Sequence, residues 1–229
     1  MIRALVIGAL LLSGAPLAHA ALSPAEQKMA ASVEAGYEPA VGLLEKLVNQ
    51  NSGSLNLAGV KVVADMLRPE FEALGFAVVW KPMDAAKRAG HFIATHKGRA
   101  GTTKMLLIGH LDTVFEPDSP FQTFRRDGDM ASGPGAADDK GGVVTMLLAL
   151  KAMQAAGTLK AANIEVVLTG DEEDSGDPIS VARADLIQAG KRADVALDFE
   201  GLSQEDGKDM GSIARRSSNS WTLTTTGKS

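Results

Sequence analysis

Two hydrophobic patterns alternate along the chain. Apolar residues recur at helical spacing in four segments, residues 23–50, 56–75, 141–157 and 177–190. Short runs rich in Val, Ile and Leu predict strands at residues 76–83, 91–98, 103–110, 162–170 and 193–201. Strands that alternate with helices are typical of an α/β layered domain with a mostly parallel central sheet flanked by helices. We expect the first three strands to be neighbours in that sheet.

Capping residues, glycines and prolines predict where the first helices begin and end. Ser23 followed by proline is a typical helix start, and Gly75 lies where a helix of residues 56–75 would place its terminal glycine. Because proline lacks an N–H and clashes inside a helix, we expect the first helical segment to break near Gly36 or Pro39. Pro69 predicts a kink or a break in the second.

The first twenty residues differ from the rest of the chain. Arg3 precedes the apolar run "ALVIGALLLSGAPLA", and the run ends in Ala-His-Ala. This order is typical of a secretory signal peptide, residues 1–20, with cleavage before Ala21. The alternative is an uncleaved membrane anchor, which the glycine and proline in the run and the cleavage box disfavour. We therefore expect an exported protein, periplasmic or secreted, without a stable membrane anchor after cleavage.

Composition narrows the possible chemistry. The chain has 229 residues, with 23 Lys and Arg against 28 Asp and Glu, so it lacks the basic surface that nucleic-acid binding requires. It has no cysteine, which excludes disulfides and thiolate metal sites. Any metal must be held by His, Asp and Glu.

Candidate ligands gather where predicted strands end. In an open α/β sheet, ligands bind beyond the carboxyl ends of the strands, so groups distant in sequence can converge there. Each group alone has an ordinary explanation, such as a hydrogen-bonded structural histidine, a solvated acidic loop or a helix cap. The groups are His110 with Asp112, Asp171 with Glu172 and Glu173, Asp198 with Glu200, and Asp138 with Asp139 immediately before a helix.

Taken together, these groups indicate a cation site. Several carboxylates that converge near no base other than Lys140 raise one another's pKa unless a cation lies among them. One imidazole with three or four carboxylates suits zinc, with Mn²⁺ or Co²⁺ as substitutes. Calcium is the competing ion, in a non-catalytic secreted module. It has no need of His110, and residues 171–177 lack the acid spacing of an EF-hand loop.

Four motifs in register resemble one family. The chain is similar, over about residues 38–229, to the co-catalytic dizinc amidohydrolases and exopeptidases that include carboxypeptidase G (glutamate carboxypeptidase), succinyl-diaminopimelate desuccinylase and aminoacylase. Pro134 and the exported context look most like the glutamate carboxypeptidases. The motifs are "GHLDTV" (109–114), "GPGAADDKGG" (133–142), "TGDEEDSG" (169–176) and "DFEG" (198–201).

The resemblance implies a metal site with two zinc ions. It implies that His110 and Glu200 bind the first zinc ion, Glu173 binds the second, and Asp138 bridges both. The family's second zinc takes a further histidine from near the C-terminus, and no histidine follows His110 in this chain.

The resemblance also implies roles for the neighbours of these ligands. Glu172 is expected to be the general base and acid, and Asp112 to hydrogen-bond the imidazole of His110 and fix its tautomer. The peptide between Asp138 and Asp139 is expected to be cis. Two further histidines, His91 and His96, match no ligand motif, and we expect them to be structural or solvent-facing.

The last residues of the sequence predict that these 229 residues are part of a longer protein. We expect residues 21–211 to form the N-terminal part of the catalytic domain and residues 212–229 to begin a truncated lid or dimerisation domain, with "WTLTTTG" (221–227) as its first strand. The full-length protein is expected to be a homodimer. These 229 residues alone are expected to be weakly active or inactive.

The predicted function is zinc-dependent amide hydrolysis next to a free carboxylate, releasing a C-terminal amino acid such as glutamate. The substrate would be a small peptide or an N-acyl amino acid. The alternatives within the family are an N-acyl-amino-acid deacylase and an aminopeptidase. By resemblance, glutamate rather than aspartate at position 200 favours a carboxypeptidase or acylase.

Overall fold

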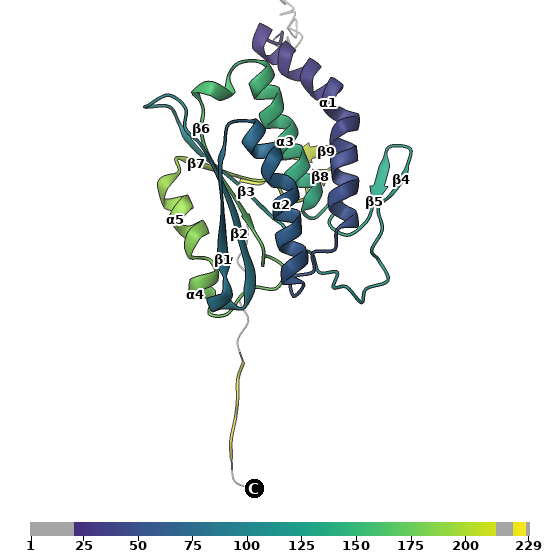
Figure 1. Ribbon diagram of the computed structural model, residues 1–229, viewed down its shortest axis with the longest axis vertical. Helices are drawn as coiled ribbons and strands as arrows, with labels where there is room; N and C mark the ends of the chain where they lie inside the picture. The colour runs from purple at the N-terminus through teal and green to yellow at the C-terminus, as the bar shows by residue number, and fades with distance from the viewer. Residues whose placement is uncertain (1–20, 214–221, 228–229) are drawn as a thin grey trace, which may run out of the picture.

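A five-stranded sheet with helices on both faces organises the chain (Figure 1). The computed structural model describes residues 21–213 and 222–227. The expected signal peptide, residues 1–20, lies outside them. Among the described residues, no helix is both long and apolar enough to span a membrane.

The strand order places β6 (Asn163–Thr169) at the centre of the sheet. The order is β1 (Ala77–Met83), β2 (Arg88–His96), β6, β3 (Lys104–His110) and β7 (Val195–Asp198). Strand β3 pairs in parallel with β6 and β7, whereas β2 pairs antiparallel with β1 and β6. Four of the five strands therefore run in one direction, which confirms the mostly parallel sheet.

One expectation about the sheet was wrong, because β3 is not a neighbour of β2. The chain passes from β3 through α3 (Lys140–Ala155) and returns as β6, which lies between the two strands. In β6, Val166, Val167 and Leu168 are fully buried. Such runs are similar in every interior strand, so the hydrophobic pattern predicts the strands but does not order them.

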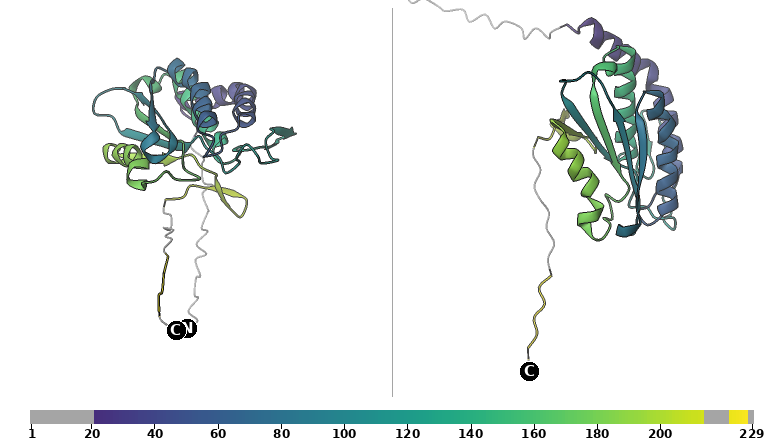
Figure 2. Two further views of the ribbon diagram at one scale, coloured as in Figure 1. Left: turned by 60° about the horizontal axis from the view of Figure 1, so that its bottom comes forward. Right: turned by 60° about the vertical axis from the view of Figure 1, so that its left-hand side comes forward.

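Three helices cover one face of the sheet and two short helices the other. Figure 2 shows α1 (Pro24–Asn49), α2 (Leu57–Ala73) and α3 on one side, with α4 (Ile179–Ala182) and α5 (Ala184–Arg192) opposite. The remaining elements are η1 (Asp84–Ala86), η2 (Leu159–Ala161), the hairpin of β4 (Arg125–Asp127) and β5 (Met130–Ser132), and the hairpin of β8 (Ser203–Glu205) and β9 (Lys208–Met210).

The first helix is continuous, so the expected break near Gly36 or Pro39 was wrong. Ser23 caps the helix, as expected, in a reciprocal capping box with Glu26. Gly36 instead allows close packing of two helices, because a Cβ there would lie 2.7 Å from a methyl carbon of Leu148 on α3. Pro39 is exposed, so water can satisfy the carbonyl that it leaves without a partner.

The second helix also continues through its proline. Pro69 lies inside α2 and is exposed, so the expected break does not occur there. Gly75 has φ +86° immediately after the C-cap residue Leu74. It therefore has the left-handed backbone that its sequence position predicts.

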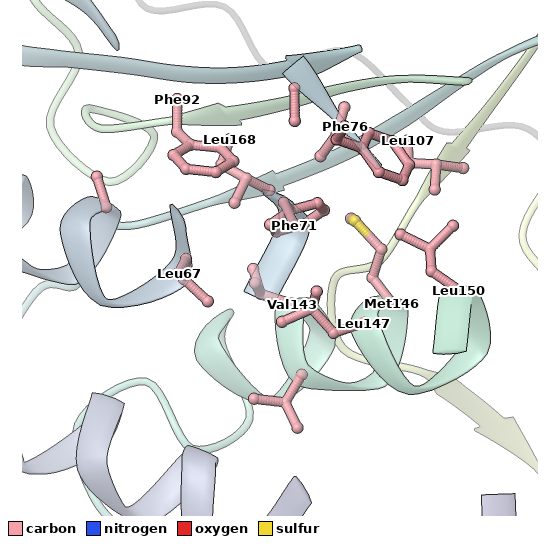
Figure 3. Close-up of a cluster of buried hydrophobic side chains, with 14 of the residues drawn as sticks. Leu67, Phe71, Phe76, Phe92, Leu107, Val143, Met146, Leu147, Leu150 and Leu168 are labelled. Carbon is pink, nitrogen blue, oxygen red and sulfur yellow. The ribbon is translucent and has the colours of Figure 1, made fainter. Parts of the chain in front are cut away.

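The largest hydrophobic cluster of the described residues joins α2 and α3 to the sheet (Figure 3). Phe71 of α2 is fully buried, and its ring centroid lies 5.6 Å from that of Phe76 and 5.2 Å from that of Phe92. Met146 and Leu150 of α3 pack into the same cluster. This core holds the strand ends and the start of α3 in fixed relative positions.

Residues 222–227 are exposed and form no strand in the described part of the chain, so the strand expected for residues 221–227 is not formed there. A strand without a partner leaves its backbone hydrogen-bonding groups to water. The domain boundary expected at residue 212 stays a prediction.

The core generates a stability prediction. Phe71→Ala should lower the free energy of unfolding by about 3–5 kcal/mol, because it removes a buried ring and leaves a cavity. Val79→Ala, at a side chain that is 50% exposed on β1, should change it by less than about 1 kcal/mol. Urea unfolding followed by circular dichroism measures both values. Equal losses for the two variants would contradict the assignment of Phe71 to the core.

Candidate metal centre

The predicted ligands meet at one end of the sheet. His110 is the last residue of β3, Glu172 and Glu173 follow β6, and Glu200 follows β7. Asp138 lies just before α3, at the same end. The parallel strands and the buried core therefore bring together residues that are up to 90 positions apart, from 110 to 200.

Five residues form two overlapping groups of possible metal ligands. In each group, one ligand atom from every residue lies within 4.8 Å of the others. One group is His110, Glu172 and Glu200, and the other is His110, Asp138 and Glu173. His110 is shared and buried, whereas the acids are exposed or half-buried. The centre therefore has a buried histidine at its base, and its acids face solvent.

Four other acids that the sequence singled out belong to neither ligand group, and Asp112, described below, is one of them. Asp171 and Asp139 are fully buried and make other contacts. Asp198 is exposed at the end of β7.

The imidazole of His110 is oriented from both sides. Its Nε2 lies 2.7 Å from Asp138 Oδ1. Its Nδ1 lies 3.1 Å from the main-chain oxygen of Asp112 and 3.4 Å from Oδ1 of the same residue. The predicted contact with Asp112 is therefore present, with the main-chain carbonyl as the nearer acceptor. An Nδ1–H in this position leaves Nε2 facing the acids, where it can carry a proton in the metal-free chain or, without that proton, bind a metal.

The buried carboxylate of Asp112 also holds the loop between β6 and α4, residues 170–178, which we call the acidic loop. Oδ1 accepts the N–H of Glu172 at 3.0 Å, and Oδ2 accepts the N–H of Glu173 at 3.1 Å. The Ser54 hydroxyl donates to Oδ2 at 2.6 Å. The sequence did not indicate Ser54, because it lies 58 positions away in an unremarkable polar loop.

The peptide between Asp138 and Asp139 is cis, as the resemblance implies. Asp139 Oδ2 accepts the N–H of His110 at 3.0 Å, and Oδ1 is buried without a hydrogen-bond partner. Burial raises the pKa of Asp139 to about 7. A Cβ at Gly142 would clash with Asp139 Oδ1 and the carbonyl of Phe199, so only glycine fits at this point of α3.

Electrostatics at the centre favour a bound cation. Burial opposes the charged imidazolium of His110, yet hydrogen bonds and charges from Asp112, Asp138 and Asp139 raise its pKa to about 10. Burial raises the pKa of Glu172, His110 lowers it, and repulsion from Glu200 raises it again. The cluster thus stabilises a proton on His110 and disfavours ionisation of Glu172 and Glu173, as expected where carboxylates lie close together.

Lys140 directs its ammonium to a main-chain oxygen and not to these acids. Its buried ammonium donates to the main-chain oxygen of Gln50 at 2.8 Å, and desolvation lowers its pKa to about 7. One imidazole nitrogen and several carboxylate oxygens are ligands that fit a divalent cation such as zinc. Two of these ligand atoms, His110 Nε2 and Asp138 Oδ1, lie 2.7 Å apart. The residues present therefore fit the metal that the motifs imply.

His91 and His96 have structural positions, as expected. Nε2 of His91 lies 2.8 Å from the Ala182 carbonyl, and its Nδ1 lies 3.4 Å from the N–H of Gly170. His96 lies 2.9 Å from the Ala162 carbonyl through Nδ1. Neither histidine is in a ligand group.

Comparisons with known proteins agree with the motifs. A model of the peptidase family M20/M25/M40 matches residues 106–215. Carboxypeptidase G2 of Pseudomonas sp. (strain RS-16) is 34% identical over 203 residues, which cover 87% of this chain and 48% of that protein. A succinyl-diaminopimelate desuccinylase of Novosphingobium aromaticivorans is 35% identical over 170 residues, covering 69% and 43%. The chain thus spans about half the length of the curated relatives it matches.

Solved structures confirm the expected fold. Human carnosine dipeptidase 1 superposes with a TM-score of 0.65 at 18% identity, covering 77% of this chain and 41% of that one. An M20 family metallo-carboxypeptidase from Sulfolobus solfataricus gives 0.55 at 21% identity, covering 69% and 36%. The α/β architecture inferred from the sequence is confirmed by these structures, while the family resemblance is supported by the family model and the curated relatives.

The electrostatics of the centre generate a pH prediction. Because the pKa of His110 is raised from 6.5 to about 10, its charge stabilises the metal-free fold fully below pH 6.5 and loses this effect as pH rises through about 10. At pH 8 the metal-free chain should therefore carry a doubly protonated His110 ring. Imidazole ¹⁵N shifts measure this, with His110→Gln to assign the signal. A His110 ring that titrates near 6.5 would contradict the prediction.

Proposed function

Since residues 106–215 belong to the peptidase family M20/M25/M40, we propose that the whole protein is a zinc-dependent hydrolase of amide bonds next to a free carboxylate. It releases a C-terminal amino acid, in the manner of a glutamate carboxypeptidase. The observation that carries the proposal is the pair of ligand groups that share His110, one of which contains Glu172. The named activity of the Pseudomonas relative supports the carboxypeptidase assignment.

The ligand groups support the zinc ligands that the motifs imply. His110 and Glu200 share one group and would hold the first ion, while Asp138 and Glu173 share the other and would hold the second. Asp138 lies 2.7 Å from His110, the residue that both groups share, and this supports the proposal that it bridges the two ions. Bound zinc would polarise the scissile carbonyl and lower the pKa of a water molecule.

Glu172 is the proposed general base and acid. Burial raises the pKa of its carboxyl above the usual value, which brings proton affinity closer to neutral pH, where acid–base catalysis is most effective. Its side chain is exposed in the open part of the centre, and Asp112 holds its N–H. A carboxylate oxygen of Glu172 would take the proton of the attacking water and then deliver it to the leaving amine.

Two related activities, those of a deacylase and an aminopeptidase, are the alternatives. The desuccinylase relative favours N-acyl amino acids as substrates, which would make the protein a deacylase, and an aminopeptidase would use the same ligand groups. A calcium-binding module is disfavoured because an imidazole belongs to both ligand groups.

We further propose that the protein is exported through residues 1–20 and acts as a homodimer on small peptides or N-acyl amino acids. The apolar run and the Ala-His-Ala box support export. Cell fractionation with sequencing of the mature N-terminus tests it, and a mature chain that retains Met1 would contradict it.

The base assignment predicts a selective loss of turnover. In the whole protein, Glu172→Ala should lower kcat by about 100- to 10,000-fold, because general acid–base catalysis contributes about this much, while zinc content is unchanged. Asp118→Ala, at an exposed acid outside both groups, should leave kcat unchanged. Steady-state kinetics and metal analysis measure both. Retained turnover in Glu172→Ala, or a wild type without zinc, would contradict the mechanism.

Substrate recognition predicts a dependence on the free carboxylate. The whole protein should release glutamate from an N-acyl-glutamate and leave the corresponding C-terminal amide intact. A subsite that binds the substrate carboxylate rejects the amide, because the polar groups of the subsite are then left without a charged partner. Chromatography of the products measures both reactions. Cleavage of a glutamyl amide that carries a free amino group would instead identify an aminopeptidase.

A further inference from the structure

The acidic loop after β6 is held by an arginine that belongs to neither ligand group. Arg183 lies between α4 and α5. Its Nη1 is 2.7 Å from Oδ1 of Asp171, whose side chain is fully buried. Its Nη2 donates to the main-chain oxygen of Asp171 at 2.9 Å and to the Ser175 hydroxyl at 2.6 Å. One guanidinium therefore holds the loop at three points.

These contacts fix one particular peptide group. The carbonyl of Asp171 accepts from Arg183, and the N–H of the same peptide, on Glu172, donates to Asp112 Oδ1 at 3.0 Å. The peptide that joins Asp171 to Glu172 is thus held at both ends by side chains from different parts of the fold. Its plane sets the direction in which the Glu172 side chain leaves the backbone.

Two more contacts brace the same loop. Asp171 Oδ2 accepts the N–H of Gly176 at 2.8 Å, which closes the loop on itself. His91 connects Gly170 to the Ala182 carbonyl, next to Arg183. The start of the acidic loop and the turn that carries Arg183 are therefore joined twice, through the Asp171–Arg183 ion pair and through the imidazole of His91.

We propose that Arg183 is a positioning residue, which acts through Asp171 to fix the peptide before Glu172 and so aims the general base at the metal centre. The proposal rests on the function proposed above. A planar guanidinium offers parallel donors to the carboxylate and the carbonyl of one residue, whereas a lysine ammonium is a single point of charge. A small misplacement of a catalytic group is costly in rate.

The test compares Arg183 with a matched arginine in the whole, zinc-loaded protein. Arg183→Met should lower kcat by about 10- to 100-fold, the usual cost of removing a group that orients a metal-site residue, with KM little changed and zinc still bound. Arg192→Met is the control, because Arg192 of α5 makes a similar ion pair with Glu165 of β6 at 2.6 Å and belongs to neither ligand group. Arg183→Lys should be intermediate.

Arg183→Met leaves the Asp171 carboxylate buried without its partner, so it can unfold the chain. The double variant Arg183→Met/Asp171→Asn removes both charges together and keeps the test possible. It should show the same loss of kcat at a temperature where circular dichroism shows it fully folded.

A second measurement is independent of activity. Amide hydrogen exchange at Glu172 and Glu173 should accelerate in the Arg183 variants, with or without zinc, and should be unchanged in Arg192→Met. Unchanged exchange at these amides, or a folded double variant with wild-type kcat, would overturn the proposal. If wild type lacks zinc-dependent hydrolysis, the proposed function fails, and exchange alone then shows whether Arg183 holds the loop.

Discussion

The carboxylate of Asp112 is the contact on which the arrangement of the metal centre depends. It is fully buried, and it accepts the N–H groups of Glu172 and Glu173 and the hydroxyl of Ser54. Asp112 also faces Nδ1 of His110. Burial raises its pKa, but hydrogen bonds from His110 and Ser54 more than offset this and lower the pKa overall. A buried carboxylate with this many donors stays ionised, so it can fix three segments at once.

The electrostatic consequence is that, among the residues the structure describes, carboxylates outnumber basic groups at the centre. The acids of the centre face one imidazole, while the nearby ammonium of Lys140 donates to a carbonyl and Arg183 pairs with Asp171. The pKa of His110 is raised because a proton on its ring adds positive charge beside these acids. A divalent cation bound to the same groups would release that proton.

Sequence motifs and tertiary packing contribute differently to this picture. His110, Asp138, Glu172, Glu173 and Glu200 could be selected from the sequence, because strand ends and a helix start gather candidate ligands at one edge of an α/β sheet and the family resemblance distinguishes these five from their acidic neighbours. Among the groups that hold them, Asp112 could also be selected through the resemblance, whereas Ser54 and Arg183 could not. Ser54 and Arg183 are ordinary residues in a loop and a helical turn, and only the folded chain places them within 3 Å of Asp112 and Asp171.

The sequence by itself determined the local elements and the chemistry: the helix cap at Ser23, the strands, the absence of thiolate ligands, and a set of one histidine and several acids. These properties depend on short-range backbone preferences and on residue type. Only the tertiary structure decided that α1 and α2 run through their prolines, that β6 lies between β2 and β3, and that one peptide is held by both Asp112 and Arg183. These outcomes depend on packing and hydrogen bonds between segments far apart in the chain, and no local pattern encodes such contacts.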